Sequence, residues 1–192
     1  GLAEGAVFTA ETIRDLLPVL AGGGAGGPRW SGAAAVLEEA EAAPDRTRTL
    51  LEALAWHVER HPERRHIAFD PGEGGPPEEL TYADLERRSR QVAHGLRQAG
   101  LAPGQAVALM LPSGLDYFAA FFGAQMAGGV PVPLYPPARL SQIEDHLRRQ
   151  AGILRTAQAR VLISFAEVLP LARLLRGQVP DLKQVTTVGD LS

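Results

Sequence analysis

From residue 49 onward, helical and extended patterns of apolar residues alternate along the chain. Apolar positions three or four residues apart predict helices over 49–61, 81–99, 115–126, 141–157 and 166–175. Short apolar runs predict strands over 67–69, 107–111, 130–134, 160–164 and 184–188. Strands that are apolar throughout are typical of parallel sheets buried on both faces. The pattern therefore predicts an α/β fold, a layered and mostly parallel sheet flanked by helices.

Turn and capping residues mark where several of these elements begin and end. Thr81 can cap the helix that follows it, and Asp84, three residues on, completes a variant of the capping box. Gly100 is expected to end this helix in a left-handed conformation. Ser113 lies between a strand and a helix and is interpreted as the cap of that helix. The glycine- and proline-rich stretch 71–79 predicts a hairpin-like loop.

The first 47 residues have a different character. Residues 8–20 carry apolar side chains on one helical face, but this segment is too short to bury that face alone. The run from Gly22 to Gly27 predicts a flexible linker at a domain boundary. Although it contains a G-x-G-x-x-G pattern, it has neither the preceding strand nor the following helix of a dinucleotide site. The predicted organisation is a helical N-terminal extension at 1–21, a linker at 22–47 and a domain at 48–192.

Composition narrows the class of protein further. Of the 192 residues, 45% are hydrophobic and 21% are charged, as in ordinary globular domains, and the formal net charge is -3. Because no basic excess exists to bind a phosphate backbone, no nucleic-acid partner is expected. The absence of cysteine excludes a disulfide framework and thiolate metal sites, which agrees with a cytoplasmic location.

Two further features concern targeting. The chain begins at Gly1 without a Met or a signal-peptide pattern, so we expect a piece of a longer protein without a secretion signal. The most apolar stretch, 117–134, is interrupted by Gln125, Pro131 and Pro133. A buried helix followed by a buried strand therefore explains this stretch better than a transmembrane segment.

Few residues have a pattern that suggests catalytic chemistry. His57 and His61 stand four apart on a predicted helix, the spacing of two ligands to one metal ion. Because no third ligand is evident, a solvated, charge-rich helix end is the favoured interpretation. Ser113 lies where an exposed nucleophile can stand, but Leu111 occupies the position at which that motif requires glycine.

The predicted helix over 141–157 presents a basic face formed by His146, Arg148, Arg149 and Arg155. Such a face can meet phosphate or an acidic carrier protein. A solvated face is more common, and Glu144, four residues before Arg148, is placed to pair with it. Residue types and spacing alone thus lead to an α/β domain without an assigned function.

Three stretches, taken together, resemble the opening of adenylate-forming enzymes, the superfamily of acyl-CoA synthetases, peptide-synthetase adenylation domains and luciferases. Leu80-Thr-Tyr-Ala-Asp-Leu85 is similar to the first core motif of this superfamily, usually Leu-Thr/Ser-Tyr-x-Glu-Leu. Residues 100–112 resemble its glycine turn and following strand, and residues 124–134 resemble its second core motif. The order and spacing of the three stretches also agree with the superfamily.

Within the superfamily, residues 133–139 and 142–154 look most like fatty acyl-AMP ligases and acyl-CoA synthetases. Relatives of this kind often belong to multidomain proteins with carrier and acyltransferase modules. Residues 8–20 are similar to the last helix of an acyl carrier protein. The resemblance thus implies that 1–21 end a carrier-like segment and that 48–192 form the N-terminal part of an AMP-binding (adenylation) domain.

The reaction that the resemblance implies has two steps. A fatty acid and ATP, with Mg²⁺, give acyl-AMP and pyrophosphate, and the acyl group then passes to the thiol of a carrier protein or of CoA. The family's phosphate loop, nucleotide motifs and lid lysine have no counterpart in this sequence, and its single lysine, Lys183, stands outside any such context. We therefore expect no catalytic residue, no metal site, no bound cofactor and no adenylation from the chain alone.

Three residues are candidates for lining an acyl channel, because they are aromatic or rigid groups near a predicted strand end: Tyr135, Pro136 and Phe122. Ordinary core packing is the alternative for all three. Two other functions stay open. One is a non-catalytic scaffold or interaction module that keeps the ligase-like fold. The other is an unrelated nucleotide-binding α/β domain, which requires a glycine-rich strand-to-helix turn that the sequence lacks.

Overall fold

The computed structural model describes residues 44–71, 76–137 and 143–192. The chain divides into two units, 1–43 and 44–192, and the described residues all belong to the second. The predictions for the extension at 1–21, for most of the linker at 22–47 and for Ser141 as a helix cap therefore lie outside the described residues.

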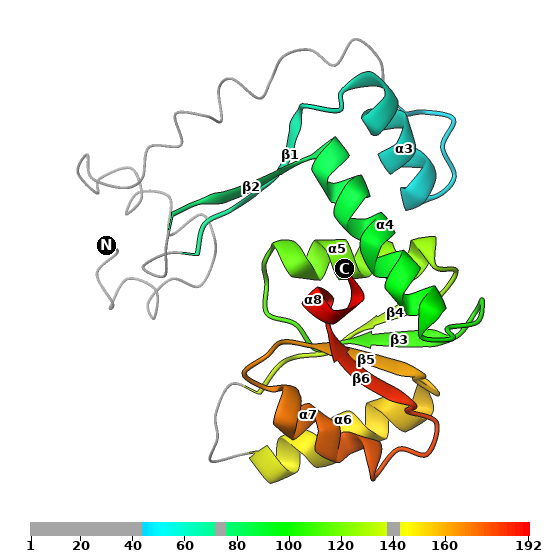
Figure 1. The fold of residues 1–192 in the computed structure, drawn as a ribbon, viewed down its shortest axis with the longest axis vertical. Coiled ribbons are helices and arrows are strands. Elements are labelled where there is room, and N and C mark those ends of the chain that lie inside the picture. Colours follow the sequence, from blue (N-terminus) through cyan, green and yellow to red (C-terminus); the bar gives the residue numbers. More distant parts are fainter. Residues whose placement is uncertain (1–43, 72–75, 138–142) are drawn as a thin grey trace, which may run out of the picture. The chain divides into compact units, whose positions relative to one another are not determined.

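Four parallel strands form the central sheet of the described unit (Figure 1). They are β3 (Ala106–Leu109), β4 (Val130–Pro133), β5 (Val161–Ser164) and β6 (Gln184–Thr187). Their order across the sheet is β4-β3-β5-β6, and Ala108 of β3 pairs with Val132 on one side and Leu162 on the other. Each crossover between parallel neighbours contains a helix, as their geometry requires. The predicted α/β class is confirmed.

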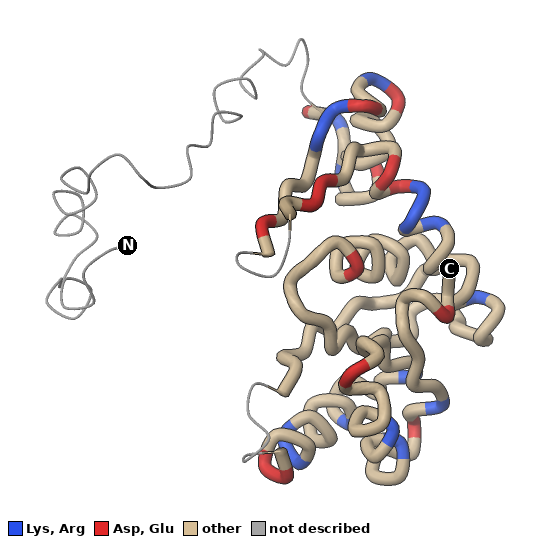
Figure 2. Tube along the Cα trace, turned by 60° about the vertical axis from the view of Figure 1, so that its left-hand side comes forward, with Lys and Arg blue, Asp and Glu red and all other residues tan. Residues whose placement is uncertain are grey.

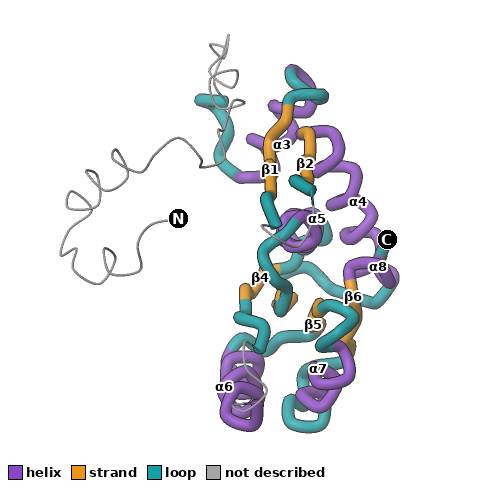
Figure 3. The backbone as a smooth tube through the Cα atoms, turned by 90° about the vertical axis from the view of Figure 1, so that its left-hand side faces the viewer, coloured by secondary structure: helices purple, strands orange, loops and turns teal. Residues whose placement is uncertain are grey.

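Helices cover both faces of this sheet (Figures 1 and 3). One layer consists of α4 (Tyr82–Gln98), α5 (Leu115–Met126) and α8 (Val188–Leu191), and the other of α6 (Ile143–Thr156) and α7 (Leu169–Arg176). Alternate side chains of a strand point to opposite faces, so Val107 and Leu109 pack in the first layer and Ala108 and Met110 in the second. Because both faces are covered, every position of β3 and β5 is buried.

A two-stranded antiparallel hairpin and helix α3 (Leu50–Arg60) complete the described unit. The hairpin consists of β1 (Arg65–Phe69) and β2 (Glu78–Thr81). A third apolar cluster joins it to α3, α4 and α5 through Leu54, Leu80, Leu85 and Leu115. The sequence predicted β1 but assigned residues 71–79 to a loop, so β2 was missed. Its glutamates have low strand propensity, and the pairing with β1 decided its structure.

Thr81 caps α4 as predicted, but Asp84 accepts from the hydroxyl of Thr81 instead of from its backbone N–H, so the predicted capping box is not completed. The hydroxyl oxygen of Thr81 accepts the N–H of Asp84 at 3.1 Å, and the hydroxyl donates to Oδ2 of Asp84 at 3.0 Å. The helix ends at Gln98, and Gly100 adopts the predicted left-handed conformation with φ of 83°. The prediction that Ser113 caps α5 was wrong. Gly114 holds the cap position there, without any side-chain cap hydrogen bond, and the extended backbone at Gly114 leaves Ser113 one residue too early.

Two other boundaries differ from the predictions. The last strand was predicted over 184–188, but β6 ends at Thr187, where a capping box with Asp190 begins α8. The helix predicted from residue 166 begins at Leu169, with Pro170 in its first turn, where the missing N–H removes no helical hydrogen bond. The first difference arises from a side-chain cap and the second from a turn in which the N–H groups of Val168 and Leu169 bond to the carbonyl oxygen of Phe165, and apolar periodicity registers neither.

The apolar stretch 117–134 forms most of α5 and all of β4, but the prediction that the strand is buried was wrong. Because β4 lies at the edge of the sheet, its residues are half-buried or exposed, with Val130 52% exposed. Within the described ranges, no helix is long and apolar enough to cross a membrane. Charged residues gather on α3, the hairpin, α4 and the outer helices α6 and α7, while the parallel strands carry none (Figure 2).

Helices α4 and α5 cross closely at Gly123. A Cβ atom at this position would lie 2.7 Å from Cβ of Val92 and 2.9 Å from the carbonyl oxygen of Ser89. This close packing sets the position of α5 against α4. The first residues of α5 are thereby held at the carboxyl edge of the sheet.

Candidate functional site

A cleft of about 730 Å³ lies at the carboxyl ends of β3 and β4. Its floor and rim come from the segments that follow these strands, 111–114 and 133–136. Tyr117 and Phe118 of α5 line a second side, and residues 67–69 of β1 line a third. Ligands of open α/β sheets bind outside the carboxyl ends of the strands, so the position of this cleft agrees with that of a binding site.

The lining of the cleft is uncharged. Among the described residues that form it, none is Asp, Glu, Lys, Arg or His. Its side-chain polar groups are the hydroxyls of Ser113, Tyr117 and Tyr135. Such a lining suits an apolar group with few hydrogen-bonding atoms, because a charged group moved into it loses hydration without gaining a partner.

The structure brings two of the three predicted substrate-binding residues together. Tyr135 and Pro136 line the cleft side by side, and Tyr135 is 85% exposed at its rim. Phe122 does not line the cleft, because it packs against the third apolar cluster beside Leu85 and Leu115. Substrate binding by any of the three stays a prediction.

The sequence did not single out Ile67, Phe69, Tyr117 or Phe118 as cleft residues. Tyr117 and Phe118 belong to a strongly apolar helix, where an aromatic side chain is most simply read as core. Ile67 and Phe69 alternate with exposed residues in β1, a pattern that predicts a half-buried strand. Nothing local indicates that this strand folds over the carboxyl edge of the sheet, since that placement depends on long-range contacts.

Ser113 is exposed on the rim of the cleft. A serine nucleophile needs an adjacent base to take its proton. No histidine or carboxylate of the described residues lines the cleft with it. The described lining of the cleft therefore supplies no base to Ser113.

The cleft does not offer what nucleotide phosphates require. Phosphates are held by cationic side chains or by the N–H groups at a helix N-terminus. The described lining has neither Lys nor Arg, and the first turn of α5 carries Asp116, whose charge opposes anion binding there. The point at which strand order reverses lies between β3 and β5, whereas the cleft lies at the ends of β3 and β4. The described lining therefore offers no group that would hold the phosphates of ATP.

A cluster of rings joins α3, β1 and α4 beside the third apolar cluster. The ring of Tyr82 stacks on His57 at 4.4 Å and on His66 at 4.3 Å between centroids. Partial burial, and then the charges of His61 and Arg64, lower the pKa of His57. Partial burial, and then the nearby His57, lower the pKa of His66. The stack therefore favours neutral imidazoles.

The histidines of α3 are less solvated than the sequence predicted. Nδ1 of His57 and Nε2 of His61 are buried without a hydrogen-bond partner, because their rings pack among Trp56 and Tyr82. Over residues 44–71, 76–137 and 143–192, no group of three or more His, Cys, Asp or Glu is arranged to hold a metal ion.

The basic side chains of α6 are engaged differently from the prediction. Arg148 pairs with Asp145 at 2.8 Å, whereas Glu144 was the predicted partner. The ion pair therefore forms between residues three apart at this exposed helix start, and not between residues four apart as predicted. Arg155 donates to the carbonyl oxygen of Gln178, at the end of α7, at 3.2 Å.

Sheet order, helical layers and an apolar cleft at the carboxyl edge define an open-sheet α/β domain. Its sequence matches the family described as AMP-binding enzyme over residues 54–191, and the chain belongs to this family of adenylate-forming enzymes. The resemblance carried by residues 80–85, 100–112 and 124–134 is thereby confirmed.

Relatives in the family act on different acids, according to their names. The chain is 33% identical over 146 residues to salicyl-AMP ligase / salicyl-S-ArCP synthetase of Mycobacterium tuberculosis, which covers 74% of this chain and 25% of that protein. It is 36% identical over 131 residues to long-chain-fatty-acid–AMP ligase FadD32 of Mycolicibacterium smegmatis. This match covers 62% of this chain and 21% of that protein. The chain thus spans about a quarter or less of the length of these relatives.

Solved structures agree with the family. A structure of fatty acyl-adenylate ligases from E. coli and L. pneumophila aligns with a TM-score of 0.56 and 30% identity over 59% of this chain and 20% of that chain. The L. pneumophila fatty acyl-adenylate ligase in complex with acyl adenylate and pyrophosphate aligns with a TM-score of 0.65 and 21% identity. This alignment covers 78% of this chain and 25% of that chain. The second likeness is one of fold.

Proposed function

We propose that this chain is the N-terminal part of the large domain of an ATP-dependent ligase that activates fatty acids. The parent protein would join a carboxylate and ATP into acyl-AMP and pyrophosphate, with Mg²⁺. It would then transfer the acyl group to the thiol of a carrier protein or of CoA in the cytoplasm. Family membership and the names of the relatives support the reaction type.

One observation carries the choice of a fatty acid as substrate. The cleft at the carboxyl edge is apolar and without charged lining among the described residues, and Tyr135 and Pro136 stand at its rim. This chemistry suits the tail of the acid and leaves the nucleotide to residues outside the chain. The chain would therefore supply a wall and a scaffold, while the groups that stabilise charge on the phosphates come from elsewhere in the parent.

The test uses the full-length protein that carries this chain. Pyrophosphate release is measured with ATP, Mg²⁺ and either a fatty acid, salicylate or no acid. Release that depends on fatty acid is the expected result. Release with salicylate alone would mean that the substrate is an aryl acid and not a fatty acid. No release with any acid would favour a non-catalytic scaffold that retains the ligase-like fold.

A second measurement concerns the chain by itself. We expect the 192-residue chain to show no ATP–pyrophosphate exchange, because it contains no phosphate loop and no lysine in a catalytic context. Full-length protein at the same concentration serves as the positive control. Exchange above background from the chain alone would contradict the proposal that it lacks the catalytic centre.

A further inference from the structure

The hairpin supplies one wall of the cleft although it is not part of the parallel sheet. Residues 67–69 of β1 line the cleft, while β1 pairs only with β2 among the described strands. Ile67 and Phe69 stand two residues apart, so they share one face of the strand. Both are half-buried, and both pack against the third apolar cluster, as does Phe118 of α5, which also lines the cleft.

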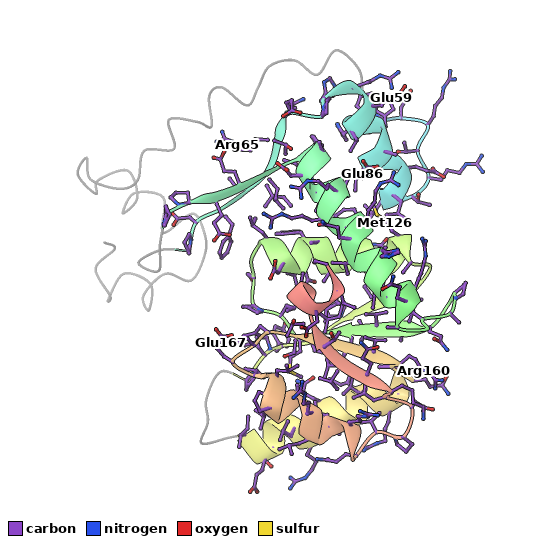
Figure 4. All side chains as sticks on the ribbon, viewed as in Figure 1. Glu59, Arg65, Glu86, Met126, Arg160 and Glu167 are labelled. Carbon is purple, nitrogen blue, oxygen red and sulfur yellow. The ribbon has the colours of Figure 1, made fainter. Side chains whose placement is uncertain are left out.

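Contacts within the described unit hold this wall in place. Leu80 of β2 is 1% exposed, pairs with Ile67 across the hairpin and belongs to the third apolar cluster. Arg65 of β1, labelled in Figure 4, pairs with Glu79 of β2 at 2.5 Å. Because the hairpin is fixed at these points, the size of the side chains at 67 and 69 directly sets the width of the cleft on this side.

We propose that Ile67 and Phe69 determine which acids the protein selects, by limiting the size of the apolar group that enters the cleft. This inference rests on the proposed function, since it names the part of the same site that distinguishes one acid from another. The segments that follow β3 and β4 contribute Pro112, Gly114 and Pro133 to the lining, and these small or rigid residues give that part of the cleft little freedom to vary in size. The hairpin wall is built from larger side chains whose volume a substitution can change.

The experiment compares acids of increasing length on the full-length protein. Phe69→Leu and Phe69→Ala remove atoms from the wall, and Ile67→Phe adds them. For each variant, kcat/KM is measured by pyrophosphate release with linear acids from short to long, together with KM for ATP. One methylene in an apolar pocket changes discrimination by roughly 10-fold or more.

The expected results have opposite signs. Phe69→Leu and Phe69→Ala should shift the preference toward longer or bulkier acids, and Ile67→Phe should shift it toward shorter ones, each by about 10-fold in the ratio of kcat/KM. KM for ATP should stay unchanged. Phe165→Leu is the matched control, because Phe165 is also a half-buried phenylalanine on a core cluster and does not line the cleft.

Several outcomes would overturn the inference. An unchanged order of preference in all three variants would show that the hairpin does not touch the acid. An equal shift in Phe165→Leu would trace the effect to general loosening of the core. A rise in KM for ATP with an unaltered acid preference would place the nucleotide in the cleft. If the unsubstituted protein activates no acid, the proposed function itself fails, which is a separate result.

Discussion

In the parallel sheet, every side chain of β3 and of β5 is buried, whereas β1 of the hairpin alternates exposed with half-buried residues. The sheet is stabilised by apolar burial on both faces, under two layers of helices. The hairpin depends on Leu80, on the ring stack at Tyr82 and on the pair between Arg65 and Glu79. A fully buried strand tolerates little change, while a half-exposed strand can vary at low cost in stability.

This difference agrees with a division of labour around the cleft. The sheet places the ends of β3 and β4 and fixes the floor, and the hairpin adds a wall whose side chains can differ without disturbing the central core. Selectivity is more easily changed in the hairpin than in the sheet, because small-to-large changes in a close-packed interior cause strain. Four measurements on the 192-residue chain test how far the comparison holds.

The largest effect is expected in the sheet. Leu162 of β5 is 0% exposed, so Leu162→Ala should lower the free energy of unfolding by about 2–5 kcal/mol, as measured by denaturant titration. Ile67→Ala, in the half-buried hairpin wall, should cost clearly less. Equal losses for the two substitutions would break the comparison between sheet and hairpin.

The helical layer on the sheet should be nearly as sensitive. Gly123→Ala forces a Cβ to within 2.7 Å of Cβ of Val92 and should cost about 1–3 kcal/mol. Gly152 of α6 is the matched control, because no atom lies within 4 Å of a Cβ added there. Gly152→Ala should stabilise the chain by about 0.4–1 kcal/mol, through a less flexible unfolded state. A loss of stability at both positions would point to a helix effect unrelated to packing.

The stability of the hairpin region should depend on pH, whereas that of the sheet should not. Burial lowers the pKa of His57 and of His66 in the folded chain below the usual 6.5. Between the lowered pKa values and pH 6.5, the unfolded chain therefore binds more protons than the folded chain. Stability is thus fully present above pH 6.5 and is lost as the pH falls below it. Melting temperatures measured from pH 8 to pH 5 should show the decrease.

His57→Phe combined with His66→Phe keeps two rings stacked on Tyr82 and removes both titrations, so it should flatten this dependence. His146 of α6 also has a pKa lowered by burial, and then by Arg149, so it contributes to the slope that persists in the double variant. An unchanged slope in the double variant would show that the hairpin is not the pH-sensitive part.

The smallest effect is expected at the ion pair of the hairpin. Arg65 and Glu79 are 40% and 51% exposed, so solvent screens their attraction. A double-mutant cycle with Arg65→Gln and Glu79→Gln should give a coupling of at most about 1 kcal/mol. The exposed pair Arg148–Asp145 on α6 provides the reference. A coupling well above that of the reference would mean that charge, more than Leu80, fixes the hairpin.

Much of the fold followed from the sequence because it depends on local signals. Apolar runs predicted β3, β4 and β5, helical periodicity predicted α3 to α6, and Thr81 and Gly100 marked the two ends of α4. The strand β2 and the helix α8 were missed, since Glu78 and Glu79 gain their strand conformation from pairing with β1 and α8 depends on a cap at Thr187.

For the cleft, the sequence by itself determined that Tyr135 and Pro136 follow a strand, and therefore stand at the carboxyl edge of the sheet. Only the tertiary structure decided that Phe122 packs against the third apolar cluster and that Ile67 and Phe69, more than 40 residues away in the sequence, line the same cleft as Tyr117 and Phe118. The physical reason is that period and capping act over a few residues. The position of a hairpin against a sheet is chosen by which apolar surfaces bury each other, and no local pattern records that choice.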